Sequence, residues 1–188
     1  MESLNQIEAS VLMWIQENIR TELLDKLMIF LSAINNAGMI AILAVLLLLI
    51  WRRYRYVGLT AFSSLFIEFM LVNVFLKNIV HRIRPFVVNE ELILLGDMPG
   101  DYSFPSGHTG SAFAVAVVIY LCMPRRYGIP AIVVATLISL SRLYNGAHYP
   151  TDVLGAVVIA IITGMLAWRL VFPAASKRLQ KAGETQKE

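Results

Sequence analysis

The sequence predicts an all-α fold: a polytopic membrane helical bundle of about six transmembrane helices, with a short N-terminal interfacial helix. The 188 residues are 57% hydrophobic and only 15% charged, with a mean hydropathy of +0.66, which is far more apolar than soluble domains are. The apolar residues also fall in long blocks and not in the alternation of a half-buried sheet. Because a spanning segment must satisfy its own backbone hydrogen bonds, each block is expected to be a helix.

The N-terminal residues 1–22 mix charged and apolar side chains. They lack the basic start and small-residue cleavage site of a signal peptide, so we expect them to be retained. Ile7, Val11, Leu12 and Trp14 recur at nearly helical spacing, which favours a short amphipathic helix lying in the membrane interface. An ordinary solvated helix is an equally good interpretation of the same spacing.

Six apolar segments follow, at about 22–34, 37–51, 56–77, 107–123, 128–144 and 151–171. The first of them is short for a membrane span. Turn residues at 35–38, 52–55 and 123–128 and two longer polar loops separate the segments. We therefore expect one membrane-embedded domain over 1–188, with a core of about 20–172 and a basic cytoplasmic tail at 173–188.

Positive charge indicates the orientation of these segments. Basic residues gather at alternate loop ends, namely Arg52, Arg53, Arg55, Arg125, Arg126, Arg169, Lys177, Arg178 and Lys181. The positive-inside bias places that side in the cytoplasm, together with both termini, and places the loops at 78–106 and 145–150 outside the cell membrane. The first outer loop nevertheless carries a cluster of cations, from Lys77 to Arg84. Acidic residues offset it in part, namely Glu90, Glu91, Asp97 and Asp101. A bound anion explains such a cluster better than topology does.

Three polar blocks stand at helix ends on this predicted outer face. They read Lys77-Asn-Ile-Val-His-Arg-Ile-Arg84-Pro85, Pro105-Ser106-Gly107-His108 and Ser141-Arg142 followed by His148 and Asp152. The cations Lys77, Arg84 and Arg142 can meet the charge of a phosphoryl-transfer transition state without a metal. Ser106 and Gly107 open a helix whose free N–H groups favour an anion. We expect neither a metal nor another cofactor.

Two histidines of these blocks can divide the chemistry of phosphoryl transfer. Pro150 suits the first turn of the last helix, so Asp152 would lie in that turn and could reach back to a ring nitrogen of His148. The other nitrogen would then be free to attack phosphorus. His108 would be the acid that protonates the leaving oxygen.

In order and spacing these blocks resemble the type 2 phosphatidic acid phosphatase superfamily over about residues 20–172. Its pattern is Lys, six residues, Arg-Pro; then Pro-Ser-Gly-His; then Ser-Arg, five residues, His, three residues, Asp, and every fixed position is present. The resemblance implies a phosphohistidine intermediate on His148, with His108 as the acid. It also implies phosphate binding by Lys77, Arg84, Ser106, Gly107, Arg142 and Ser141.

The resemblance and the predicted sidedness together favour one substrate class, a lipid phosphate. The small size is similar to that of bacterial enzymes acting on undecaprenyl pyrophosphate, the substrate we favour, or on phosphatidylglycerol phosphate or phosphatidic acid. Transfer of the phosphate to another acceptor, a vanadate-dependent haloperoxidase and a non-enzymatic membrane protein stay open as alternatives. The expected partners are this lipid and the bilayer, not nucleic acid, and the oligomeric state is open.

Isolated polar residues carry less information than the three blocks. Singly, Lys77, Arg84 and Arg142 would be interpreted as snorkelling side chains at helix ends. Glu68, in the middle of a span, is as readily a functional group as a carboxyl hydrogen-bonded to a neighbouring helix. His81 and Arg82 can contact a lipid headgroup, although solvated loop positions are the simpler interpretation.

Overall fold

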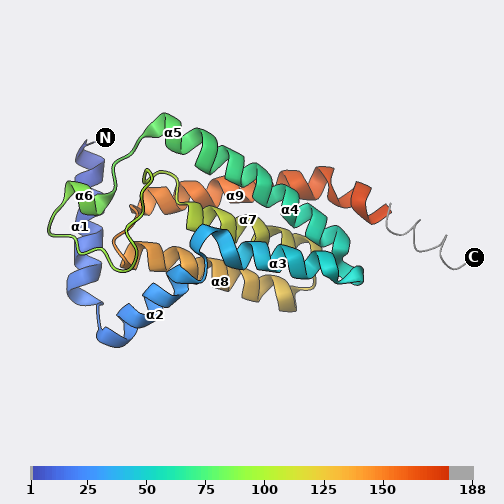
Figure 1. Ribbon diagram of the computed structural model, residues 1–188, viewed down its shortest axis with the longest axis horizontal. Coiled ribbons are helices and arrows are strands. Elements are labelled where there is room, and N and C mark those ends of the chain that lie inside the picture. Colours follow the sequence, from blue (N-terminus) through green and yellow to red (C-terminus); the bar gives the residue numbers. More distant parts are fainter. Residues whose placement is uncertain (1, 178–188) are drawn as a thin grey trace, which may run out of the picture.

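The chain forms a bundle of helices in a computed structural model that describes residues 2–177 (Figure 1). Within these residues the structure contains helices and no strand. In chain order the helices are α1 (Glu2–Asn18), α2 (Glu22–Ala33), η1 (Asn36–Gly38), α3 (Met39–Ile50), η2 (Arg52–Tyr54), α4 (Arg55–Phe69), η3 (Met70–Leu76), α5 (Lys77–Val80), α6 (Pro85–Val88), α7 (Gly107–Cys122), α8 (Arg125–Tyr144) and α9 (Pro150–Leu170). The all-α prediction is confirmed for the described part of the chain.

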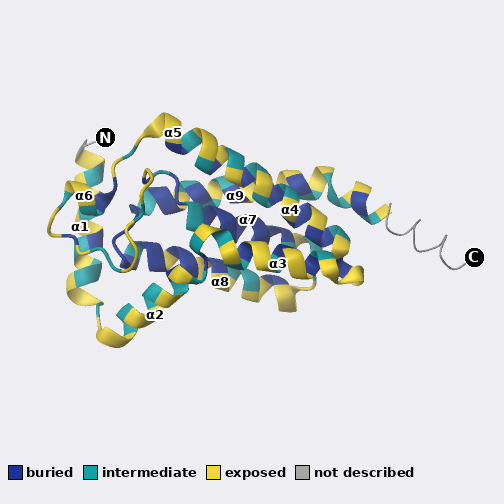
Figure 2. Cartoon of the chain, in the orientation of Figure 1, coloured by how far each residue is buried: buried dark blue, intermediate teal, exposed yellow. Residues whose placement is uncertain are grey.

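Helix α7 is the centre of the bundle and packs against α3, α4, α8 and α9. Every residue from Thr109 to Val118 is buried, and Figure 2 shows this helix dark blue between its neighbours. Small side chains at alternate positions of α7 allow the neighbouring helices to approach closely. At Gly110 the approach is so close that a Cβ atom would lie 1.9 Å from Oε1 of Glu68 on α4.

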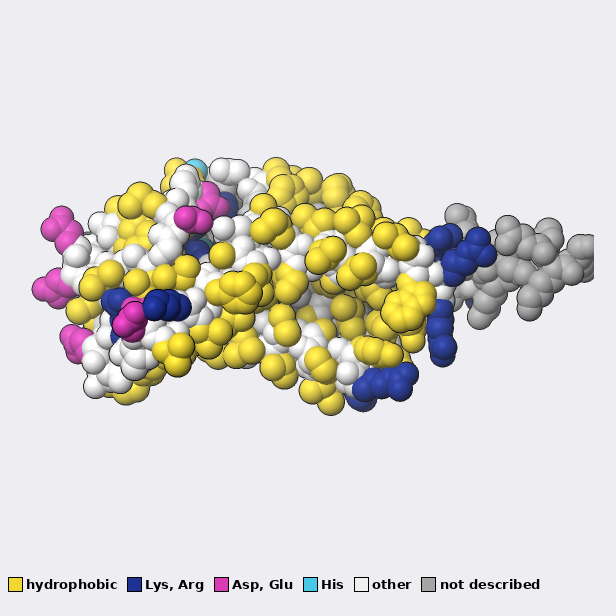
Figure 3. All heavy atoms as spheres, turned by 60° about the horizontal axis from the view of Figure 1, so that its bottom comes forward, with side chains coloured by type: hydrophobic (Ala, Val, Ile, Leu, Met, Phe, Trp, Pro, Cys, Tyr) yellow, Lys and Arg dark blue, Asp and Glu magenta, His cyan; other side chains and the backbone are white. Residues whose placement is uncertain are grey.

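The outer surface of the bundle is apolar along its length. Figure 3 shows hydrophobic side chains over its body, and the large exposed ones include Leu43, Leu47, Phe62, Val133 and Leu154. Such a continuous apolar surface fits contact with lipid. Among residues 2–177 three helical stretches are long and apolar enough to cross a membrane, namely Arg52–Val88, Arg125–Tyr144 and Pro150–Lys177.

The prediction of six separate spans is not confirmed. The first two predicted segments, 22–34 and 37–51, form α2 and α3. Together these helices are long and apolar enough for a fourth span, but only as a pair bent by 44°. Each has 12 residues, or about 18 Å at 1.5 Å per residue, which is too short for a hydrocarbon core of about 30 Å. The turn residues at 35–38 therefore mark a bend, whereas six separate spans would require the chain to reverse there.

This bend changes the predicted placement of the termini. Helix α1 lies across the same end of the bundle as the loops at 81–106 and 145–149, whereas α9 ends at the opposite end (Figure 1). The expectation that both termini share one side of the membrane is therefore not supported by the described residues. The basic tail was predicted for 173–188, of which residues 178–188 lie outside the described part.

The basic loop ends meet as predicted. The α3–α4 and α7–α8 junctions and the end of α9 lie together at the end of the bundle away from α1 (Figure 1), which brings Arg52, Arg53, Arg125, Arg126 and Arg169 to one end of the molecule. The predicted N-terminal helix also exists. Its residue Leu12 is fully buried against Leu92 and Tyr149, while Trp14 is exposed.

Candidate active site

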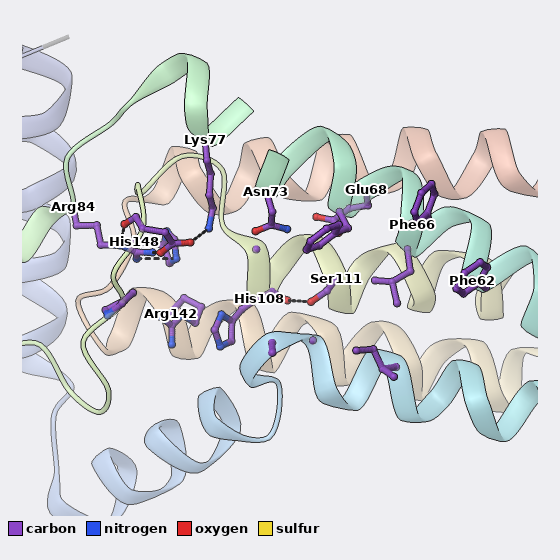
Figure 4. Close-up of a pocket in the computed structure, with 18 residues that line it drawn as sticks. Phe62, Phe66, Glu68, Asn73, Lys77, Arg84, His108, Ser111, Arg142 and His148 are labelled. Atoms are coloured by element: carbon purple, nitrogen blue, oxygen red, sulfur yellow. Dashed lines mark hydrogen bonds and ion pairs between the residues drawn. The ribbon is translucent and has the colours of Figure 1, made fainter. Parts of the chain in front are cut away.

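The three predicted blocks meet around one cavity of about 420 Å³ at the α1 end of the bundle (Figure 4). Six of the nine predicted site residues line it, namely Lys77, Arg84, Gly107, His108, Arg142 and His148. The other three are buried behind its wall: Ser106, Ser141 and Asp152. The cavity continues away from the cations along α4, where its lining becomes apolar at Phe62, Phe66 and Ile42.

Lys77, Arg84 and Arg142 bring three buried cations to this cavity. Each of the three residues keeps about 5% of its surface exposed. Lys77 comes directly after the π-helix η3. The Arg142 guanidinium donates to the hydroxyl of Ser32 on α2, and its Nε has no partner among the described residues. Burying cations together is costly unless an anion compensates them. The cavity is therefore suited to bind an anion at this end.

Asp101, in the loop before α7, is the acidic residue closest to these cations. Its carboxylate accepts hydrogen bonds from the Lys77 ammonium and from the Arg84 guanidinium. Although burial opposes ionisation, these two cations lower the pKa of Asp101 to about 2. In the sequence, Asp101 was only one of four acidic residues that partly offset the cations of its loop.

Helix α7 points its N-terminus at the same cavity. The Ser106 hydroxyl accepts from the Thr109 backbone N–H at 3.4 Å, so Ser106 caps the helix and leaves Gly107 at the cavity wall. A Cβ atom at Gly107 would lie 3.0 Å from Oδ1 of Asn73 and 3.6 Å from Nζ of Lys77. Glycine at this position thus allows an anion to approach the free N–H groups of the first turn.

His148 is fully enclosed between Arg84 and Asp152. Its Nε2 lies 3.1 Å from Nη1 of Arg84, and because a guanidinium can only donate, Nε2 is the unprotonated nitrogen. Burial lowers the pKa of His148 to about 3, so the ring is neutral at neutral pH. A neutral imidazole with an unprotonated Nε2, which here accepts from Arg84, is the form that a nucleophile requires.

Asp152 lies in the first turn of α9, after Pro150, as predicted. Its Oδ2 is 3.6 Å from Nδ1 of His148, which is longer than a hydrogen bond. The same oxygen accepts from the Tyr149 backbone N–H at 2.9 Å and from the Ser103 hydroxyl. The carboxylate is therefore aimed at the imidazole, and a small movement would close the bond.

His108 is held by the bend between α2 and α3. Oδ1 of Asn36 lies 3.0 Å from Nε2 of His108, and the side-chain amide of Asn35 donates to the His108 carbonyl at 2.9 Å. The imidazole of His108 thus reaches the cavity from the wall opposite Lys77 (Figure 4). In the sequence these asparagines only marked a turn.

Arg82 is the largest departure from the sequence analysis of this site. Its side chain is buried, and Nη1 donates to Oδ1 of Asp152 at 2.6 Å. The interpretation as a solvated or headgroup-contacting residue is wrong, because in the loop at 81–84 the side chains of Arg82 and Arg84 are buried while the intervening Ile83 is exposed. In the sequence, the spacing of Arg82 and Arg84 by two positions was the feature that could have indicated that both side chains point inward.

Ser141, a predicted phosphate contact, does not line the cavity, whereas Glu68 does. The Ser141 hydroxyl donates to the carbonyl of Ile138 within its own helix. Glu68 lines the cavity between the cations and the phenylalanines, and neither carboxyl oxygen has a hydrogen-bond partner among the described residues. Within residues 2–177 no group of three or more His, Cys, Asp or Glu side chains is placed to hold a metal ion.

Comparisons with known proteins agree with this arrangement. Residues 53–175 match the PAP2 superfamily. Over 154 residues the chain is 34% identical to undecaprenyl-diphosphatase BcrC of Bacillus subtilis, covering 78% of this chain and 74% of that protein. It is 33% identical to an undecaprenyl-diphosphatase of Sulfolobus acidocaldarius, covering 84% and 76%.

A solved structure also shares the fold. The crystal structure of Aquifex aeolicus LpxE superposes with a TM-score of 0.75 at 27% identity, covering 85% of this chain and 93% of that chain. The family match covers more than half of the 188 residues, and its span contains all three blocks that line the cavity. The chain therefore belongs to the PAP2 superfamily, as a membrane-embedded phosphatase.

Proposed function

We propose that this phosphatase removes the terminal phosphate of undecaprenyl diphosphate and releases undecaprenyl phosphate. One observation carries the proposal: a single cavity joins three buried cations at one end to an apolar lining at Phe62, Phe66 and Ile42 at the other. A ligand that fills both ends carries a phosphate on a hydrophobic chain. The two undecaprenyl-diphosphatase relatives favour a polyprenyl diphosphate within that class.

The reaction uses His148 and His108 in two steps. Nε2 of His148 attacks the terminal phosphorus, the bond from phosphorus to the bridging oxygen breaks, and the proton on His108 passes to that oxygen. Water then attacks the phosphorus of the phosphohistidine while His108 takes up a proton from it, the bond from phosphorus to Nε2 of His148 breaks, and phosphate leaves. Lys77, Arg84 and Arg142 stabilise the charge on the equatorial oxygens, with the first-turn N–H groups of α7. Asp152 orients His148 and stabilises its cationic form.

We place this site on the extracytoplasmic face of the cell membrane. The basic loop ends lie at the opposite end of the bundle, and the positive-inside bias assigns that end to the cytoplasm. Helix α1 would then lie outside with the site. Single cysteines in a Cys122→Ser background test this placement. Cysteines at Ser10 and Glu90 should react with a membrane-impermeant thiol reagent in intact cells, and one at Arg126 should not; the reverse pattern would put the site in the cytoplasm.

The substrate is tested with purified protein in detergent. Phosphate release is measured on undecaprenyl diphosphate, phosphatidylglycerol phosphate and phosphatidic acid, and compared as kcat/KM with and without a chelator. We expect the diphosphate to have the highest value and the chelator to leave it unchanged. A higher value for a glycerophospholipid would replace the proposed substrate. Transfer of the phosphate to an added alcohol, in place of its release as inorganic phosphate, would indicate a phosphotransferase.

A further inference from the structure

A buried chain of charged groups connects helix α1 to the histidine of the active site. Arg82 donates through Nη2 to Glu8 on α1 and through Nη1 to Asp152 on α9. The side chains of Glu8, Arg82 and Asp152 are 6%, 8% and 0% exposed. Glu8 also accepts from the backbone N–H of Thr151 at 2.6 Å, so it contacts the first turn of α9 directly.

The two carboxylate oxygens of Asp152 have different hydrogen-bond partners. Oδ1 accepts from Arg82, whereas Oδ2 accepts from Ser103 and the Tyr149 N–H and faces Nδ1 of His148. Rotating the carboxylate would break bonds at both oxygens. Arg82 is itself held in place, because Nη2 also donates to Asn5, Nη1 donates to Thr151, and Cζ lies 4.0 Å from the centroid of the Tyr149 ring.

Attachment of α1 alone does not require these charges. Leu12 already packs α1 against Leu92 and Tyr149 in an apolar cluster, and a buried ion pair contributes little to stability compared with apolar packing of the same volume. What buried ions do provide is a fixed geometry, here at the carboxylate that faces the nucleophile. A displacement of about 1 Å at a reacting group can lower a rate by about 100-fold.

We propose that Arg82, held by Glu8, is a positioning residue that fixes Asp152 against His148, so that α1 belongs to the catalytic apparatus. The proposal rests on the function proposed above, in which His148 is the nucleophile. Substitutions of Arg82 and Glu8 should therefore lower kcat per active site and leave KM nearly unchanged, because neither residue lines the substrate cavity.

The test compares Arg82→Gln, Arg82→Lys, Glu8→Gln and the double variant Glu8→Gln/Arg82→Gln, with kcat divided by the number of sites that form a covalent phosphoenzyme. We expect Arg82→Gln to lower kcat by about 10- to 100-fold with KM within about threefold. Arg82→Lys should recover part of that loss. Glu8→Gln should cost less, and the double variant should lose less kcat than the two single losses combined, because Glu8 acts on Asp152 through Arg82.

The matched control is Asp25→Asn at the same end of the molecule. It removes the Arg20–Asp25 ion pair, at 2.9 Å, without touching the chain to Asp152, and should leave kcat unchanged. Unchanged kcat per active site in Arg82→Gln, or additive losses in the double variant, would overturn the proposal and leave Arg82 a structural residue.

A second readout does not depend on turnover. The chain has 3 histidines, so ¹⁵N-histidine spectra of the full chain in detergent can resolve the tautomer of His148. We expect the Nδ1-protonated form in the wild type and a mixture with the Nε2-protonated form in Arg82→Gln. Identical His148 spectra would reject the positioning role. A wild type inactive on lipid diphosphates would reject only the proposed function.

Discussion

Replacing Asp101 with Asn tests whether this loop carboxylate occupies the position of the substrate phosphate. Asp101 binds Lys77 and Arg84, which are two of the three cations that line the cavity. A phosphate that enters must compete with the carboxylate for both. The substitution keeps the size of the side chain and removes its charge, so competition should fall and anions should bind more tightly.

The size of the effect follows from the exposure of Asp101. Its side chain is 49% exposed, so solvent screens both ion pairs, and each contributes about 0.5–1 kcal/mol. Their sum, about 1–2 kcal/mol, corresponds to about a 5- to 30-fold gain in anion affinity. Lys77 and Arg84 are buried, and without their partner the unliganded protein should lose about 1–3 kcal/mol of stability.

Two measurements on purified protein separate these effects. The inhibition constant of vanadate should fall in Asp101→Asn, while the melting temperature without ligand should also fall and its rise on adding vanadate should be larger than in the wild type. Glu90→Gln is the matched control, because it removes one negative charge from the same loop before α7 at an exposed position. An inhibition constant that is unchanged or higher in Asp101→Asn, or equally lowered in Glu90→Gln, would refute competition by this carboxylate.

Three further predictions concern the other walls of the cavity. His148→Ala should abolish turnover in a folded protein, and Asp152→Asn should lower kcat by about 10²- to 10⁴-fold, measured by phosphate release; appreciable turnover by His148→Ala would exclude it as the nucleophile. Gly107→Ala should weaken vanadate inhibition, because its Cβ would lie 3.0 Å from Oδ1 of Asn73 at the cavity wall; unchanged inhibition would show that the anion binds elsewhere. The third is a pH effect on stability. The pKa of His148 is about 3 in the folded protein and about 6.5 when unfolded, so the unfolded chain binds the proton first and stability should fall as pH drops from 6.5 towards 3. Melting temperatures between pH 7 and 4 should show a weaker pH dependence in His148→Gln than in the wild type; equal slopes would contradict the buried neutral imidazole. Asp101 has a pKa of about 2 in the folded protein, so its contribution to stability is lost only below pH 4.

The sequence by itself determined the helices, the basic end and six of the residues that line the cavity. Long apolar blocks can cross a bilayer only as helices, and the positions of the basic loop ends follow from the order of those helices. Lys77, Arg84, Gly107, His108, Arg142 and His148 were identifiable because polar residues at the ends of apolar helices stand out from their surroundings, and their spacing matches one family. Even Asp152 was placed correctly, because Pro150 marks the first turn of α9.

The tertiary structure alone decided how α2 and α3 join, where α1 lies and which residues surround the two histidines. A turn sequence such as 35–38 does not state whether the chain reverses or bends, and packing of α2 on α8 and of α3 on α4 and α7 decides it. Likewise, Arg82 contacts Glu8 across 74 positions, and Asn36 contacts His108 across 72. No periodicity or local preference encodes such pairs, because each partner is selected by the meeting of distant helix ends. Asp101 had the same charge as its loop neighbours Asp97, Glu90 and Glu91, and only the folded loop brings it, among these four, to Lys77 and Arg84.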